Sequence, residues 1–132
     1  MDNLIKAYTQ TLYKVNGFLN PIIIGKISDE LEQYLVQNNV RCWAYITAYN
    51  PMSERLSEEE NENRNSQLRN DLRDYIKIKG IGVDLNGKWI GEKSFLVLGI
   101  DRTNAISLAR KYGQKGVVYG EIGEPAELLL TN

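Results

Sequence analysis

Two apolar runs place the strongest limit on how this chain can fold. The run from Arg41 to Thr47 and the run from Phe95 to Ile100 are hydrophobic at nearly every position. A strand that is apolar on both of its faces belongs in the interior of a sheet, because only there are both faces covered. We therefore predict that these two runs are the central strands of one sheet.

Capping and turn signals predict the elements around these strands. Ser57 with Glu60 three positions later forms a capping box, which is typical of a helix start. The pair Asn86-Gly87 favours a hairpin turn, and we interpret the glycines of the segment 80–87 as turn residues. The predicted elements are a helix to about residue 75, a strand at 75–83, a strand at 95–100, a helix at 101–112 and a strand at 116–120.

The order strand, helix, strand, strand, helix, strand is that of a ferredoxin-like βαββαβ core, here residues 41–121 of an α+β domain. In this topology the first and third strands are central and antiparallel, which agrees with the two apolar runs. Before the core we expect an N-terminal helix-strand-helix extension, and after it a tail that is either a helix or an edge strand. The extension is predicted as a helix at 2–15, a strand at 21–25 and a helix at 28–39. A three-layer α/β arrangement is the alternative.

Length and charge exclude several classes of protein. A chain of 132 residues is long enough for one core, so residues 1–132 are expected to form a single domain. The net charge of −1 provides no overall field that would attract a nucleic-acid backbone. The longest apolar runs are too short to span a membrane, and the N-terminus lacks the layout of a signal peptide. We therefore expect a cytoplasmic protein with no membrane association.

The absence of histidine limits the chemistry further. Without histidine there is no Ser-His-Asp triad, no Cys-His pair and no histidine-ligated metal. Cys42 is the only cysteine, which rules out an internal disulfide and a multi-cysteine zinc site. Catalysis would have to rest on carboxylates, Lys, Tyr, Ser or a carboxylate-held metal. No metal site is predicted, and no cofactor is indicated.

Polar residues at the ends of the two central strands are predicted to converge. If the two runs are antiparallel neighbours, the end of the first lies beside the start of the second. Residues that follow the first run then meet residues that precede the second. The residues expected together at this end are Thr47, Asn50, Glu92, Ser94 and Gln114.

The helix predicted from Ser57 has polar residues on the side that should face the sheet. Asn61 and Arg64 fall on the same face as Leu68, and Asn65 lies close to them. Burying such groups without partners costs about 1 to 3 kcal/mol each, so they must bond to protein, water or ligand.

These observations favour a pocket for a small anionic or nucleotide-like molecule at one end of the sheet. The helix N-terminus and the Arg64 guanidinium would attract the anion, while amides and hydroxyls would supply further hydrogen bonds. If the site is catalytic, Glu92 is the expected general base, its pKa raised by burial or lowered by Arg64. The predicted ligand-binding residues are Thr47, Asn50, Asn61, Arg64, Asn65, Ser94 and Gln114.

The same residues also have purely structural interpretations. On these, Asn50 shapes the turn before Pro51, and Arg64 forms a buried ion pair with Glu92. The second functional alternative is a protein-interaction module, such as a regulator or inhibitor of a partner protein, which docks through a sheet edge or the tyrosine-rich first helix. A homodimer also belongs to this alternative. An exposed patch of Tyr8, Leu12 and Tyr13 would favour that function. A hydrolase or transferase that acts on a nucleotide would need Glu92 within reach of the substrate.

Four segments, WAYITAYNP, LSEEENENRNSQL, WIGEKSFLVLGI and ISLARKYGQKGVVYGE, resemble a family of small bacterial proteins that is known only as a domain of unknown function. The shared pattern is W-A-x-I-T-A-x-N-P, an Asn-bearing helix, a Glu-x-Ser before a buried strand and a Gly-Gln before the last strand, over roughly residues 43 to 127. The resemblance implies no activity. The motif positions that it implies are Thr47, Asn50, Pro51, Asn61, Glu92, Ser94 and Gln114.

Overall fold

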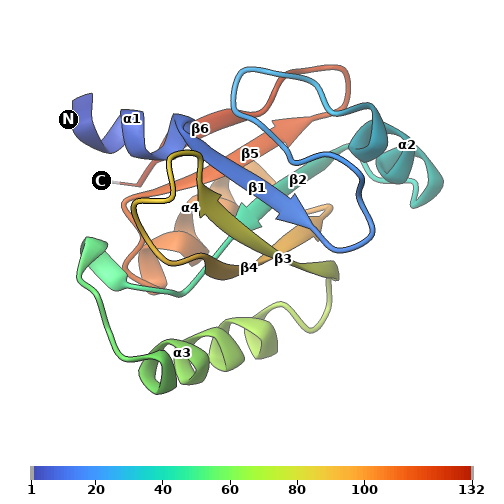
Figure 1. Ribbon diagram of the computed structural model, residues 1–132. Coiled ribbons are helices and arrows are strands. Elements are labelled where there is room, and N and C mark those ends of the chain that lie inside the picture. Colours follow the sequence, from blue (N-terminus) through green and yellow to red (C-terminus); the bar gives the residue numbers. More distant parts are fainter. Residues whose placement is uncertain (1, 132) are drawn as a thin grey trace.

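The computed structural model describes residues 2–131, whose strands form one six-stranded antiparallel sheet (Figure 1). In sheet order the strands are β1 (Thr11–Val15), β3 (Ile76–Asp84), β4 (Glu92–Leu98), β2 (Cys42–Ile46), β5 (Gly116–Glu121) and β6 (Glu127–Leu130). The helices are α1 (Asp2–Thr9), α2 (Asp29–Gln37), α3 (Glu58–Asp71) and α4 (Arg102–Lys111), with a short 3-10 turn η1 (Pro51–Ser53). No helix in this range is long and apolar enough to cross a membrane.

The two apolar runs lie side by side in the interior of the sheet, as predicted. β2 and β4 are antiparallel neighbours, and Ile46 is paired with Phe95. Each is flanked by a further strand, β5 beside β2 and β3 beside β4. The mixed α+β class is confirmed, and no parallel strand pair of the three-layer alternative occurs between residues 2 and 131.

Alternating residues of the central strands belong to two hydrophobic cores, one on each face of the sheet. Ala44 and Ile46 of β2 belong to the core that α3 and α4 cover. Trp43 and Tyr45 belong to the other core, to which α2 contributes Leu35. Side chains along a strand point alternately to opposite faces, so a strand buried on both must be apolar throughout. The continuous hydrophobicity of β2 is thereby explained.

The sheet is curled so that β1, at its edge, passes over the face that carries Tyr45 (Figure 1). The Tyr45 hydroxyl donates a 2.7 Å hydrogen bond to the Lys14 carbonyl, and the Tyr13 and Tyr45 rings meet edge to face with centroids 5.2 Å apart. Gly80 of β3 makes this approach sterically feasible, because a Cβ there would lie 2.2 Å from the Lys14 oxygen. The curl leaves an open space between β1 and the end of the central strands.

The N-terminal extension differs from its prediction. The helix predicted at 2–15 ends at Thr9, and Leu12 belongs to strand β1. The segment after Thr9 is rich in β-branched and aromatic residues, which favour a strand, and the Thr11 hydroxyl donates to the Ala7 carbonyl at the helix end. The strand predicted at 21–25 is reduced to one isolated bridge, between Tyr13 and Ile22.

Three other segments refine the prediction. The helix after Ser57 has the predicted capping box and ends at Asp71, before residue 75. The C-terminal tail contains an edge strand, β6. Gly80 and Gly82 lie inside β3, as the strand predicted at 75–83 implies, and within the segment 80–87 only Gly87 has the positive φ of a turn glycine. The interpretation of the glycines of 80–87 as turn residues therefore holds for Gly87 and is wrong for Gly80 and Gly82.

Candidate functional site

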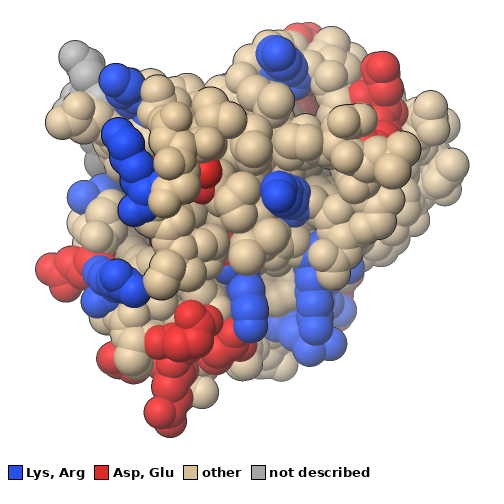
Figure 2. All heavy atoms as spheres, viewed as in Figure 1, with Lys and Arg blue, Asp and Glu red and all other residues tan. Residues whose placement is uncertain are grey.

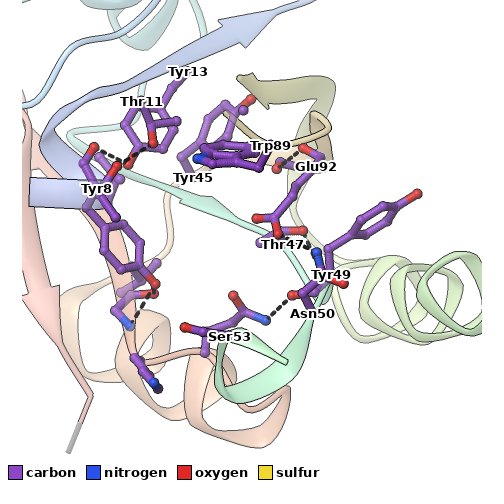
Figure 3. Close-up of a pocket in the computed structure, with 18 of the residues that line it drawn as sticks. Tyr8, Thr11, Tyr13, Tyr45, Thr47, Tyr49, Asn50, Ser53, Trp89 and Glu92 are labelled. Carbon is purple, nitrogen blue, oxygen red and sulfur yellow. Dashed lines mark hydrogen bonds between the residues drawn. The ribbon is translucent and has the colours of Figure 1, made fainter. Parts of the chain in front are cut away.

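A cavity of about 570 Å³ opens between β1 and the end of β2 and β4 (Figure 3). Its walls come from segments that are far apart in the chain but meet at one end of the sheet: α1, the loop after β2, the β3–β4 loop and the start of β5. In Figure 1 these segments all lie on the left side of the molecule. The residues that Figure 3 labels on the lining are Tyr8, Thr11, Tyr13, Tyr45, Thr47, Tyr49, Asn50, Ser53, Trp89 and Glu92.

Five of the eight predicted site residues line this cavity. They reach it from three separate segments, as expected from the antiparallel pairing of β2 with β4. The Thr47 hydroxyl even donates a 2.7 Å hydrogen bond to the carbonyl of Lys93, the residue next to Ser94. The predicted residues on the lining are Thr47, Asn50, Glu92, Ser94 and Gln114.

The other three predicted residues, Asn61, Arg64 and Asn65, lie outside the cavity and support the loop that forms its floor. Asn65 accepts a 3.0 Å hydrogen bond from the Ala48 amide, and Asn61 accepts a 2.8 Å hydrogen bond from the Asn50 amide. Both asparagines are buried, as the helix periodicity predicted. Their partners belong to the chain itself: backbone groups for both, and for Asn61 also the Asn50 side chain.

Arg64 is also engaged with the backbone. Its Nε donates a 2.9 Å hydrogen bond to the Ala48 carbonyl, and its Nη2 donates to the Tyr112 carbonyl. The guanidinium therefore links the loop after β2 to the C-terminal end of α4. The structure places Arg64 neither on the cavity lining nor in an ion pair with Glu92. We therefore no longer assign the ligand anion to Arg64.

Asn50 connects the supporting residues to the cavity. Its backbone is left-handed, with φ 47° and ψ 64°, a conformation that Asn tolerates better than most residues. Its Oδ1 accepts from the Leu56 amide at 3.0 Å and from Asn61 Nδ2 at 2.9 Å, so its Nδ2 is directed to Glu92 Oε2 at 2.7 Å. Asn50 both shapes the turn, as the local alternative predicted, and orients Glu92.

Backbone strain is concentrated beside Asn50. Met52 and Ser53 also have positive φ values, 54° and 63°, which cost of order 1 kcal/mol or more for residues with a side chain. The Met52 amide is held by a 2.6 Å hydrogen bond to the Gly113 carbonyl. Gly113 itself has φ 69°, and a Cβ there would lie 2.7 Å from Pro51 Cβ. This close packing presents Ser53 to the cavity (Figure 3).

Glu92 is the acidic residue of the lining, and its carboxyl group points into the cavity (Figure 3). Burial raises its pKa above the usual range, because the ionised form loses hydration, and the hydrogen bond from Asn50 offsets only part of this effect. A carboxyl group with a raised pKa exchanges its proton nearer to neutral pH, which suits a general acid or base. Burial, and not Arg64, is therefore the dominant influence on the Glu92 pKa.

Tyrosine side chains form the wall opposite Glu92 (Figure 3). The Tyr8 hydroxyl donates to the Gly116 carbonyl at 3.1 Å and accepts from the Gly116 amide at 3.0 Å. The Tyr13 hydroxyl donates to the Tyr8 carbonyl at 2.7 Å. Burial raises the pKa of Tyr8 to about 12, so this phenol stays protonated at physiological pH. By contrast, the Tyr49 ring points toward α3, where its hydroxyl donates to Glu58 and Glu62.

Three cationic side chains also line the cavity: Arg55, Lys88 and Lys115. Arg55 and Lys88 are exposed and Lys115 is half-buried, which places positive charge toward the mouth. Figure 2 shows basic side chains bordering the hollowed face near the β3–β4 loop, whereas acidic side chains gather over α3. Sequence reasoning did not assign these cations to the site, although Lys115 follows Gln114 directly and Lys88 follows the Asn86-Gly87 turn. It also missed the Tyr8 wall, because only the curl of β1 brings α1 to the site. The tyrosine-rich N-terminus was the one available signal.

Comparison with known proteins adds a family but no activity. None of the curated proteins and none of the solved structures gives a significant match. Residues 46–117, more than half of the chain, match the family described as "Protein of unknown function (DUF3293)". The match includes every predicted site residue and ends before β6, while α1 and β1 fall outside it. The chain therefore belongs to this family of proteins of unknown function.

Proposed function

We propose that this protein binds a small anionic or nucleotide-like molecule in the cavity between β1 and the end of β2 and β4. The observation that carries the proposal is one cavity that joins an oriented carboxyl group, aromatic walls and a cationic mouth. Its volume of about 570 Å³ lies within the range of small-molecule sites, roughly 300 to 1,000 Å³. Aromatic side chains beside a few fixed polar groups are the usual composition of such sites.

Hydrolysis or group transfer on a bound nucleotide is the second candidate function. It is favoured by Glu92, a carboxyl group with a raised pKa that faces the same cavity. In such a reaction Glu92 would take a proton from an attacking water or hydroxyl, and Asn50 would hold it in position. The exposed patch that would favour an interaction module is not formed, because Tyr13 is buried and Tyr8 half-buried.

We also propose that residues 41–121 form a ferredoxin-like core. The strand order β3–β4–β2–β5, the antiparallel pairing and the position of α3 and α4 on one face support it. The cytoplasmic location, the bacterial origin and any protein partner remain predictions from the sequence.

A cavity-blocking substitution tests the proposed binding. Ala7 is an exposed α1 residue on the cavity lining, so Ala7→Trp should place an indole in the cavity without disturbing the core. In a thermal-shift screen of nucleotides and anionic metabolites, we expect ligands that raise the Tm of the unmodified protein to lose most of that effect on Ala7→Trp. Bound ligand raises stability by mass action, so the loss of binding removes the shift.

The matched control is Thr9→Trp, which adds the same indole to an exposed α1 position outside the cavity lining. It should keep the full ligand-induced shift. Shifts that survive unchanged in Ala7→Trp would place binding elsewhere, and a screen in which no nucleotide or anionic metabolite raises the Tm would count against the proposed function itself.

A further inference from the structure

Six hydroxyl groups on the cavity lining donate hydrogen bonds to backbone carbonyls. Tyr8, Tyr13 and Tyr45 donate to carbonyl groups of Gly116, Tyr8 and Lys14. The smaller hydroxyls do the same: those of Thr11, Thr47 and Ser94 donate to the carbonyls of Ala7, Lys93 and Glu92. A hydroxyl has one proton, so toward a ligand these groups act as acceptors.

The side-chain amide of Gln114 is likewise oriented so that its N–H groups donate to the backbone. Its Nε2 donates to the carbonyls of Tyr49 and Tyr112, at 2.9 and 3.2 Å. Both partners are acceptors, so the amide cannot be flipped without losing both hydrogen bonds. The Gln114 side-chain oxygen is therefore left as a further acceptor on the lining.

Glu92 adds the strongest acceptor. Asn50 Nδ2 donates to Oε2, and the hydrogen bond from the Leu56 amide to Asn50 Oδ1 fixes that orientation. Within residues 2–131, Glu92 Oε1 and Gln114 Oε1 have no hydrogen-bond partner, and no buried side-chain nitrogen or oxygen there lacks one. Both oxygens are therefore accessible to solvent, and both residues line the cavity.

Basic side chains without a partner in the described part of the chain lie at the mouth of the cavity. Arg55, Lys88 and Lys115 line the cavity, and their side chains make no hydrogen bond or ion pair with any residue of the range 2–131. The site thus has a definite polarity, with acceptors inside and positive charge outside. An anion placed inside would face Glu92 and carbonyl-type oxygens, which repel it.

We propose that the ligand enters with a planar edge of parallel N–H donors, the N–C–N edge of a guanidine group, directed at Glu92 and Gln114, and leaves its anionic group at Arg55 and Lys88. This inference rests on the proposed function and specifies the chemistry of the molecule bound. Two parallel N–H groups match a carboxylate in a bidentate arrangement. The Tyr8, Tyr45 and Trp89 rings of the wall favour a guanine base over an aliphatic guanidine, since a flat base stacks on aromatic faces (Figure 3).

Calorimetric titration with three probes tests the proposal, at a pH well above the ordinary range of a carboxyl group. Guanosine monophosphate carries the donor edge, a ring and a phosphate, while adenosine monophosphate keeps the ring and phosphate but lacks the paired donors. Free arginine carries the donor edge and a carboxylate without a ring. We expect guanosine monophosphate to bind at least about tenfold more tightly than adenosine monophosphate, because polar groups that a ligand covers without matching them are costly.

The variant Glu92→Gln distinguishes the contribution of the ligand's donor edge to binding from that of its phosphate. Asn50 can still donate to the new amide oxygen, which leaves an amide N–H₂ facing the cavity in place of Glu92 Oε1. The preference for guanosine over adenosine monophosphate should then disappear. Lys88→Ala should instead weaken the binding of both nucleotides by the same factor, because it removes only a positive charge at the mouth of the cavity.

The outcomes distinguish this inference from the proposed function. Equal binding of the two nucleotides, unchanged in Glu92→Gln, would overturn the inferred orientation and leave the cavity as a binding site. Tight binding of arginine that depends on Glu92 would support the donor edge and assign it to an aliphatic source. No binding of any of the three probes would overturn the inferred ligand chemistry, while the Ala7→Trp screen tests the cavity independently.

Discussion

Replacing Gly80 with alanine is expected to destabilise the protein by about 3 kcal/mol, at the upper end of the cost of overpacking. A Cβ on Gly80 would lie 2.2 Å from the Lys14 carbonyl oxygen and 2.7 Å from the Tyr45 hydroxyl. The first neighbour is backbone and cannot rotate away, so β1 must move off β3. The hydrogen bond from Tyr45 to Lys14 would be lost, and the wall of the cavity would lose its support.

Gly82→Ala is the matched control, since Gly82 lies two residues further along the same strand. A Cβ there would be 3.5 Å from Thr11 Cγ2 and 3.9 Å from Tyr13 Cδ1, which are ordinary contacts. Its stability should stay within about 1 kcal/mol of the unmodified protein. Urea unfolding of both variants measures the difference. Equal midpoints for Gly80→Ala and Gly82→Ala would show that β1 does not pack over Tyr45 as described.

Arg64→Ala is expected to cost about 3 kcal/mol of unfolding free energy. The substitution removes the donor to the Ala48 carbonyl and one donor to the Tyr112 carbonyl, and leaves the space of the guanidinium empty. Ala48 is fully buried, so water does not readily replace the lost donor. The loop after β2 would also lose its link to α4, which loosens the position of Asn50.

Arg69→Ala is the control for helix propensity and net charge, because Arg69 is an exposed residue of the same helix. Chemical unfolding should show that Arg64→Ala is less stable than Arg69→Ala by most of the loss expected for Arg64→Ala. If Arg64 held the ligand anion, as the sequence suggested, Arg64→Ala would instead keep its stability without ligand and lose only ligand binding. That result would contradict the structural role assigned to Arg64.

The part of the site that could be predicted rests on strand pairing. Two strands that are apolar on both faces have to be central, and their antiparallel pairing brings Thr47 and Ser94 to one end. The helical spacing of Asn61 and Asn65 relative to Leu68 likewise predicted that both asparagines are buried. These inferences depend on hydrophobic periodicity and on short-range capping signals, both of which can be read directly from the sequence.

What could not be predicted depends on long-range geometry. The curl of the sheet carries β1 over Tyr45, and a single close approach at Gly80 permits it. Nothing in the periodicity of residues 2–15 signals that approach, so the aromatic wall that includes Tyr8 was missed. The backbone partners of Arg64 could not be predicted for a related reason: a guanidinium bonds to carbonyl oxygens as readily as to ligand oxygens, and only the fold shows which are near.

The two tryptophans provide the most direct test of the cavity as the binding site. Trp89 lines the cavity, whereas Trp43 is buried beside Gly120 and does not. Their indole N–H signals are the only two of that kind in the chain, so an amide proton–nitrogen NMR spectrum can follow each one during a titration with guanosine monophosphate. The predicted result is a progressive shift of the Trp89 indole signal with the Trp43 signal unmoved. A shift of Trp43 alone, or saturable binding that moves neither signal, would contradict the central claim.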